Sequence, residues 1–304
     1  MTTGLNISIY HSISGFFNGL KNKLTWFNLY RKAYSNYLDI ILKEFQKNYP
    51  IRGILRNNQI KILNSKDEVA LYALLGIYKN VIYNEKNDYA SFDLSLFDYD
   101  LKEITTYGIK QNLDTLLAFN TGTYEHLPVK DKVVIDIGAC TGDTSIYFAI
   151  RGAKKVIAIE PYPKNFEMLK KNIEINKLEN LIDIKLSGCA SNSSEITLDP
   201  NFDSTMRSNL NEVKDGIKIP LISLLDILKI QNFTNGILKL DCEGCEYDII
   251  LNTPEEIIQK FTHIQIEYHN GYQNIKQKLE SCGFKVNILK IENKKLGHIL
   301  AENF

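Results

Sequence analysis

The chain has 304 residues, and its 36 Lys and Arg side chains balance its 36 Asp and Glu side chains, so the formal net charge is zero. A nucleic-acid partner usually needs a basic patch, and the charge balance therefore argues against one. The five cysteines are an odd number and no signal-peptide pattern is seen, which favours a reducing interior over a disulfide framework. Because no run of eighteen apolar residues is present to span a membrane, we expect a cytoplasmic protein.

Residues 1–50 are expected to form a helical segment. Apolar side chains recur at steps of three or four residues between about 10 and 48, and Pro50 ends the run. Two interpretations stay open. The segment is either a helix, with at most one break, that packs on the main domain or on a second subunit, or an interfacial helix that makes peripheral contact with a membrane. The second interpretation depends on Trp26 and Phe27, which lie among basic residues.

Residues 51–129 are expected to form a mixed α/β region that acts as a cap or lid. Residues 59–63 and 68–72 are rich in apolar side chains and are separated by the polar stretch 64–67, which predicts a β-hairpin. A region in this position suits a lid that grips a substrate.

From residue 130 to residue 304, strand and helix patterns alternate, as in a doubly wound α/β sheet. The expected strands are 133–137, 155–159, 181–187, 236–241, 262–268, 284–290 and 297–303. The expected helices are 142–151, 163–176, 223–229, 246–260 and 272–282, and a small hairpin near 195–199 and 216–220 interrupts the third crossover. Only Glu292–Lys295 joins the last two strands, which is too short for a helical crossover, so these strands must pair antiparallel.

The most informative stretch is the turn after the first of these strands. Gly138 and Gly142 are separated by three residues and followed at once by Asp143, at the strand end where open α/β sheets bind ligands. Glu160 ends the next strand, where an acid can accept two hydrogen bonds from a ribose diol. The turn lacks the glycine spacing of a dinucleotide site, and Asp143 would repel a pyrophosphate. The carboxylate of Asp143 suits the ammonium end of S-adenosylmethionine (SAM), which we predict as the cofactor.

Acidic side chains and a histidine follow two later strands. Asp241 and Glu243 come after the fourth strand, and Glu267 and His269 come at the end of the fifth, so all four should lie near the sulfonium. Methyl transfer to oxygen needs a positioned acceptor and a base, and His269 or Asp241 would serve as that base. The carboxylates could instead hold a divalent ion that binds a diol. For Glu246, capping of the next helix is the favoured interpretation.

Three motifs together resemble the FkbM family of methyltransferases. They read Asp136-Ile-Gly-Ala-Cys-Thr-Gly142, then Ile159-Glu160-Pro161, then Leu238-Lys239-Leu-Asp241-Cys-Glu243-Gly244-Cys-Glu246. The resemblance covers residues from about 125 to 290. The expected fold is a seven-stranded, Rossmann-like class I SAM-methyltransferase sheet with an antiparallel last strand, preceded by a mainly helical N-terminal extension.

The resemblance also implies which residues form the site. Carried over by position, the SAM-binding residues would be Asp136, Gly138, Ala139, Gly142 and Glu160, and the family's acidic signature would be Lys239, Asp241, Glu243 and Glu246. Cys140, Asp143 and Pro161 complete the expected cofactor site. With the strand-end residues Glu267 and His269 added, the expected catalytic residues are Lys239, Asp241, Glu243, Glu267 and His269, and no metal ligand is assigned. Cys140 stands where the family usually has Asn.

The implied function is that of a SAM-dependent O-methyltransferase acting on a hydroxyl of a sugar, a glycolipid or a secondary metabolite, without a nucleic-acid partner. The rival is a catalytically silent SAM-fold subunit of a membrane-associated or glycan-modifying assembly. Loss of the strand-end acids would favour the rival, and here they are present. Methylation of a protein or nucleic-acid nitrogen is a further alternative. The N/D-P-P-Y/F motif that amino-group methyltransferases often carry after the fourth strand is not seen.

Cys242 and Cys245 have the spacing of a redox or metal motif. They stand where the FkbM family has Val and Ala, and a free cysteine behaves as a small hydrophobic residue. We therefore expect two packed thiols rather than a redox or metal site.

Overall fold

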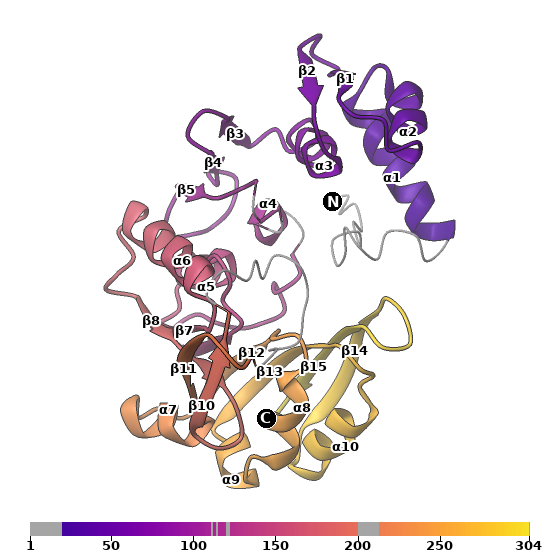
Figure 1. The fold of residues 1–304 in the computed structure, drawn as a ribbon. Coiled ribbons are helices and arrows are strands. Elements are labelled where there is room, and N and C mark those ends of the chain that lie inside the picture. Colours follow the sequence, from indigo (N-terminus) through magenta and orange to yellow (C-terminus); the bar gives the residue numbers. More distant parts are fainter. Residues whose placement is uncertain (1–19, 111, 114, 120–121, 200–212, 304) are drawn as a thin grey trace. The chain divides into compact units, whose positions relative to one another are not determined.

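The computed structural model describes residues 20–110, 112–113, 115–119, 122–199 and 213–303. Within these ranges the chain divides into two compact units (Figure 1). Unit 1 comprises the chain up to Phe97 together with Lys102–Thr121, and unit 2 comprises Asp98–Leu101 together with Gly122–Phe304. The start of the predicted N-terminal helix, from about residue 10 to residue 19, lies outside the described residues. Among those described, no helix has both the length and the hydropathy that a membrane crossing needs.

Unit 1 contains short helices and two small antiparallel sheets. Its elements in chain order are α1 (Leu20–Ala33), α2 (Tyr37–Phe45), β1 (Ile51–Ile54), β2 (Ile60–Leu63), α3 (Lys66–Leu75), β3 (Val81–Asn84), β4 (Tyr89–Asp93), β5 (Glu103–Tyr107) and α4 (Thr115–Ala118). Strand β1 pairs with β2, and β4 pairs with both β3 and β5. The predicted N-terminal helix is therefore broken once, between α1 and α2.

Aromatic residues of α1 form part of the core of unit 1. The ring of Tyr30 packs edge-on against the rings of Trp26 and Tyr34, and the hydroxyl of Tyr34 donates to the backbone oxygen of Val69 in α3 at 2.7 Å. Trp26 is only 4% exposed, whereas Phe27 is 38% exposed. Burial of Trp26 favours the packing interpretation of this helix, because an interfacial helix would need that ring at its surface.

The hairpin predicted from residues 59–63 and 68–72 is wrong. The first segment forms β2, but the second lies inside helix α3. Ser65 caps α3, because its side chain accepts a hydrogen bond from the N–H of Glu68 at 3.2 Å. The carboxylate of Glu68 in turn accepts from the N–H of Asn64 at 2.7 Å. This reciprocal cap favours a helix over a strand, and α3 buries every side chain from Val69 to Leu74.

Unit 2 holds a seven-stranded sheet in the order β14-β15-β13-β12-β6-β7-β8 (Figure 1). The strands are β6 (Val133–Ile137), β7 (Lys155–Glu160), β8 (Ile182–Leu186), β12 (Gly236–Leu240), β13 (Phe261–Tyr268), β14 (Lys285–Ile291) and β15 (Gly297–Glu302). Neighbouring strands are parallel except that β15 runs antiparallel to both β13 and β14. This is the predicted class I SAM-methyltransferase sheet, and the prediction is confirmed.

The helices of unit 2 differ from prediction at one point. They are α5 (Asp143–Ile150), α6 (Pro163–Ile175), α7 (Leu224–Ile230), α8 (Cys245–Asn252), α9 (Glu255–Ile258) and α10 (Gln273–Ser281). The single helix expected at 246–260 is wrong. Pro254, which has no N–H to continue the helical ladder, precedes α9 and separates it from α8.

The small hairpin predicted in the third crossover is confirmed. It consists of β10 (Ser194–Leu198) and β11 (Ile217–Ile222), which pair antiparallel. A short strand β9 (Gly188–Cys189) adds to β11 in parallel.

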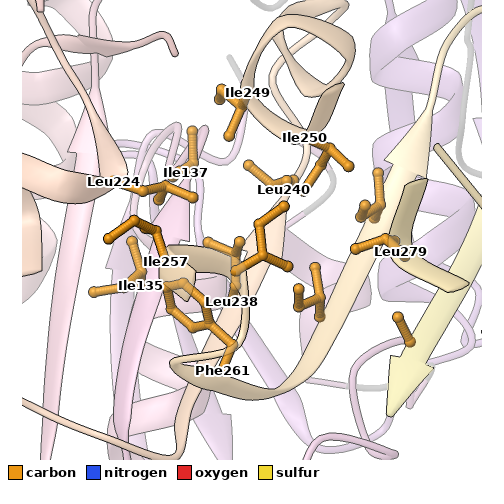
Figure 2. Packing of buried hydrophobic residues seen from close by; sticks show 14 of the residues in the cluster. Ile135, Ile137, Leu224, Leu238, Leu240, Ile249, Ile250, Ile257, Phe261 and Leu279 are labelled. Carbon is orange, nitrogen blue, oxygen red and sulfur yellow. The ribbon is translucent and has the colours of Figure 1, made fainter. Parts of the chain in front are cut away.

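One apolar cluster fixes the strands that carry the predicted site (Figure 2). Ile135 and Ile137 of β6 and Leu238 and Leu240 of β12 are buried in it, at most 1% exposed. Side chains of α7, α8, α9 and α10 pack in the same cluster. Burying a side chain of this size contributes about 1.5–3 kcal/mol, so the cluster holds the two strand ends firmly in place.

Candidate functional site

The turn between β6 and α5 passes directly against the end of β12. Gly138 and Gly142 have positive φ angles of 78° and 91°. A Cβ atom at Gly138 would lie 1.8 Å from the backbone oxygen of Asp241, so only glycine fits this close approach. The strands are parallel neighbours, with Ile137 opposite Leu240. The glycine turn and the acidic turn therefore share one edge of the sheet.

Glu160 ends β7 and reaches the glycine turn. The N–H of Cys140 donates to its Oε2 at 2.9 Å, and the N–H of Tyr162 donates to its Oε1 at 3.0 Å. The amide of Asn165 also donates to Oε1, at 3.3 Å. The side chain is buried, and burial raises the pKa of Glu160 to about 7 against the opposing effect of these hydrogen bonds. A carboxylate fixed beside the turn, where a ribose acceptor is expected, fits an adenosine cofactor.

The other predicted cofactor residues lie in or beside the same turn. Ala139 is buried, and its N–H donates to the backbone oxygen of Ile159 at 3.0 Å. Cys140 has a φ of 48°, in the left-handed region that Asn adopts more readily. Asp143 begins α5, and burial raises its pKa to about 6. Pro161 is half-buried.

Asp136 and Lys239 form a buried pair beneath the turn. Oδ2 of Asp136 accepts from the hydroxyls of Thr144 and Ser145, each at 2.6 Å. Nζ of Lys239 lies 3.1 Å from Oδ1 of Asp136 and donates to the backbone oxygen of Gly138 at 2.8 Å. Burial alone would lower the pKa of Lys239, but the charges of Asp136 and Asp241 outweigh it and hold that pKa above its usual value. The pair ties β6, α5 and β12 together.

His269, which directly follows β13, is surrounded by carboxylates from the ends of β12 and β13. Nδ1 of His269 is 3.0 Å from Oε1 of Glu246, and Nε2 is 3.3 Å from Glu243 and 3.9 Å from Glu267. Single ligand atoms of Asp241, Glu267 and His269 all lie within 4.8 Å of one another. The structure thus brings together the predicted residues of the two strand ends.

Glu246 has a local role as well. Its two carboxylate oxygens accept from the N–H groups of Cys242 and Gly244, at 2.9 and 2.8 Å, in the turn that precedes α8. This is the capping role favoured by its place in the first turn of a helix. Burial opposes a charge on His269, but the hydrogen bond and charge of Glu246, with Asp241 and Glu243 nearby, raise its pKa to about 9.

Cys242 and Cys245 form a disulfide bond, so the expectation of two packed thiols is wrong. The turn between them passes through Glu243 and Gly244, both with positive φ, at 57° and 120°. This folding brings the two Cα atoms to 5.6 Å, within the range that a disulfide needs. Cys140, Cys189 and Cys282 take no part in a disulfide bond.

Tyr124, in the segment before β6, is not among the site residues that the sequence predicts. The backbone oxygen of Tyr124 accepts from Arg151 at 2.8 Å, and its ring packs edge-on against Phe148 of α5. The neighbouring Thr123 accepts a hydrogen bond from the amide of Gln265 in β13 at 2.9 Å. Burial and the nearby charges of Asp241 and other acids raise the pKa of Tyr124 well above its usual value. No motif marks this residue, because its place depends on contacts with distant elements.

Comparison with known proteins agrees with the geometry of unit 2. A family model described as the methyltransferase FkbM domain matches residues 136–286. The ribosomal protein L11 methyltransferase of Alkaliphilus oremlandii (strain OhILAs) is 35% identical over 83 residues, which are 24% of this chain and 26% of that protein. The tRNA U34 carboxymethyltransferase of Ruthia magnifica subsp. Calyptogena magnifica is 31% identical over 103 residues, which are 34% of this chain and 31% of that protein. The match thus spans about a quarter to a third of these relatives' length.

Solved structures give weaker similarities. The methyltransferase FkbM from Methylobacillus flagellatus KT has a TM-score of 0.41 and 16% identity, covering 64% of this chain and 54% of that chain. The METTL16 MTase domain has a TM-score of 0.44 and 13% identity, covering 86% of this chain and 91% of that chain.

Proposed function

Because a model of the methyltransferase FkbM domain matches residues 136–286, we propose that the chain is a SAM-dependent O-methyltransferase of this family. Its acceptor is a hydroxyl of a sugar, a glycolipid or a secondary metabolite. When bound, SAM supplies an electrophilic methyl group. The observation that carries the proposal is the close approach of Gly138 to Asp241, which joins a cofactor turn to an acidic cluster.

In this proposal the residues of the first turn hold the cofactor. Glu160 binds the ribose hydroxyls, and Asp143 binds the ammonium group. The buried pair of Asp136 and Lys239 positions the turn, since Lys239 bonds directly to the backbone of Gly138.

The acidic cluster aligns the acceptor and receives its proton. Both ring nitrogens of His269 face carboxylates, Glu246 on one side and Glu243 on the other, so His269 acts as a positioning residue. We assign the role of proton acceptor to Asp241, which is half-buried beside the glycine turn. Alignment of the acceptor supplies most of the remaining catalytic effect.

Two other functions compete with this proposal. The printed names of the relatives include a ribosomal-protein methyltransferase and a tRNA carboxymethyltransferase, so protein and RNA acceptors belong in any test. The turn after β12 reads Asp241-Cys-Glu-Gly244 and lacks the motif often found in amino-group methyltransferases, which favours an oxygen acceptor. A catalytically silent subunit would have no need to keep the acids beside the cofactor turn.

The test is a methylation screen with the full-length chain and SAM that carries a deuterated methyl group. Glycan, lipid, small-alcohol, RNA and protein pools are offered, and products are identified by mass spectrometry. We expect labelled methyl ethers, formed at least about a hundredfold more slowly when Asp241→Asn replaces the wild type. Label on protein or RNA nitrogen would contradict the choice of acceptor. SAM binding by calorimetry without any transfer would favour the silent subunit.

A further inference from the structure

We propose that Asp241, Glu267 and His269 bind a divalent transition-metal cation of the Mn²⁺ class. Asp241 directly follows β12, while Glu267 belongs to β13 and His269 comes just after it. The strands are parallel neighbours with Leu240 opposite Ile266, so Asp241 and Glu267 are the next pair in register. Glu267 lies within the sheet, and Asp241 and His269 each lie one residue beyond the end of a strand.

The distances are close to those of a metal site. One ligand atom from each of the three residues lies within 4.8 Å of the others. Two ligands bound to one ion at about 2.0–2.2 Å lie no more than about 4.4 Å apart. Only a small contraction of the side chains is therefore needed.

The orientation of His269 is the second observation. Its Nδ1 lies 3.0 Å from Oε1 of Glu246, which is itself fixed by the N–H groups of Cys242 and Gly244. Its Nε2 is buried and makes no hydrogen bond, and it faces the carboxylates of Glu243 at 3.3 Å and Glu267 at 3.9 Å. Metal-binding histidines are usually oriented in this way, with a carboxylate on one ring nitrogen and the ion on the other.

The local charge also calls for a cation. Four carboxylates, those of Asp241, Glu243, Glu246 and Glu267, act on the single imidazole of His269. Lys239 feels the charge of Asp241, but its Nζ lies closest to Asp136, at 3.1 Å, and donates to the backbone of Gly138. His298, the other imidazole near Glu267, lies 3.9 Å from its Oε2. Glu246 and Glu267 are buried while Asp241 and Glu243 are half-buried, and grouping carboxylates in a partly buried cluster is costly unless positive charge accompanies them.

The donor set selects the kind of ion. One imidazole nitrogen with two carboxylate oxygens suits Mn²⁺, Fe²⁺ or Zn²⁺, whereas Mg²⁺ and Ca²⁺ prefer oxygen ligands alone. Three protein ligands leave coordination positions for water or a substrate oxygen. On the proposed function, an acceptor hydroxyl takes such a position, and the second oxygen of Asp241 still receives its proton.

The test is a titration of the full-length, EDTA-treated chain with Mn²⁺, with neither SAM nor acceptor present, following the free ion by electron paramagnetic resonance. We expect one Mn²⁺ per chain. Glu267→Gln and His269→Ala should each weaken binding at least tenfold, since loss of a supporting residue alone typically costs 10–100-fold. Glu243→Gln is the matched control, because it removes one charge from the same cluster but leaves the three ligands. It should weaken binding less than about threefold.

Three results would overturn the proposal: no Mn²⁺ bound by the wild type, an equal loss in Glu243→Gln and Glu267→Gln, or release of Mn²⁺ when SAM is added. The last would assign the acids to the cofactor's own positive charge. Calorimetry with SAM and thermal unfolding of each variant show whether it is folded. If buried Glu267→Gln unfolds, Asp241→Asn makes the same comparison from a half-buried position. Because metal and SAM binding are measured separately, either proposal can fail without the other.

Discussion

Two strand-to-helix turns form the site, and they differ in what their acids do. The turn after β6 and the turn after β12 each hold one non-glycine residue in the left-handed region, Cys140 at 48° and Glu243 at 57°. Beside the first turn, the carboxylates of Asp136 in β6 and Glu160 in β7 accept hydrogen bonds from hydroxyl and N–H groups. In the second, several carboxylates gather around His269. Similar backbone geometry therefore accompanies hydrogen-bonded carboxylates beside the first turn and a cluster of charged side chains beside the second.

Substitutions in one turn, followed by measurements of stability, turnover or SAM binding, show whether the other turn responds. The turns are coupled through Gly138, which touches the backbone of Asp241, and through Lys239, which bonds to the backbone of Gly138.

Gly138→Ala should have the largest effect. The new Cβ would lie 1.8 Å from the backbone oxygen of Asp241, so the two turns would have to separate. We expect a loss of at least about 3 kcal/mol in the free energy of unfolding, because strain and backbone displacement add. Urea denaturation measures it. Gly283→Ala is the control, since Gly283 also has positive φ but nothing within 4 Å, and it should cost about 1–2 kcal/mol. Equal losses would mean that the close approach carries no energy.

Asp241→Asn should lower turnover at least about a hundredfold while changing SAM affinity little. The amide keeps the shape of the carboxylate but cannot take up the acceptor's proton. Steady-state kinetics and calorimetry with SAM, on the same samples, check both parts. Asp248→Asn, on the exposed side of α8, is the control and should keep wild-type turnover. If Asp241→Asn weakened SAM binding and turnover equally, the two turns would work as one cofactor site.

The disulfide between Cys242 and Cys245 gives a smaller effect on stability. In the chain-entropy model, closing so short a loop stabilises the folded state by about 2 kcal/mol. Cys245→Ala alone and the double change Cys242→Val with Cys245→Ala should therefore lose similar amounts in chemical denaturation. Alkylation of the denatured, unreduced chain should label three cysteines, Cys140, Cys189 and Cys282, and reduction should expose two more. Five labelled cysteines without reduction would show that the bond is absent, and the double change should then be nearly silent.

Much of unit 2 is predictable from sequence because its signals are local. The apolar run of β6 matches its predicted bounds, and the short link at Glu292–Lys295 correctly implies an antiparallel β15. Glycines and acids at the ends of parallel strands then meet at one edge by topology alone. The break at Pro254 was also readable, since proline lacks the N–H that a continuous helix needs.

The failures have a different physical origin. Residues 68–72 form a helix because Ser65 and Glu68 cap it, a polar signal that an apolar pattern alone does not show. The disulfide depends on the left-handed turn at Glu243, which residue spacing does not predict. Tyr124 joins the site through contacts with Phe148 and neighbours far along the chain. Side-chain geometry and long-range contacts are thus what the sequence leaves open.

Titration of Glu160 beside the first turn should make both SAM affinity and stability depend on pH. In the free protein, burial raises the pKa of Glu160 to about 7. Ribose hydroxyls bind the carboxylate better than the neutral acid, so SAM affinity should fall about tenfold for each pH unit below about 7. Stability without SAM should change in the opposite direction. A raised pKa means that the folded state holds the proton more tightly than the unfolded chain, so protonation of Glu160 restores stability as pH falls from about 7 towards 4.5.

Calorimetry with SAM between about pH 5.5 and 8.5, roughly 1.5 pH units on either side of the pKa of Glu160, measures the change in SAM affinity. Urea denaturation of the free protein measures the change in stability. Glu160→Gln is the matched control, because it keeps the side chain's size but cannot ionise. It should bind SAM about 1.5–3 kcal/mol more weakly than the ionised wild type, and its affinity should fall only below about pH 6, where Asp143 takes up a proton. The difference in stability between the two proteins isolates Glu160 from all other titrating groups. If the variant kept the wild-type slope, an acid of the second turn would control SAM binding, and the division of labour between the turns would be wrong.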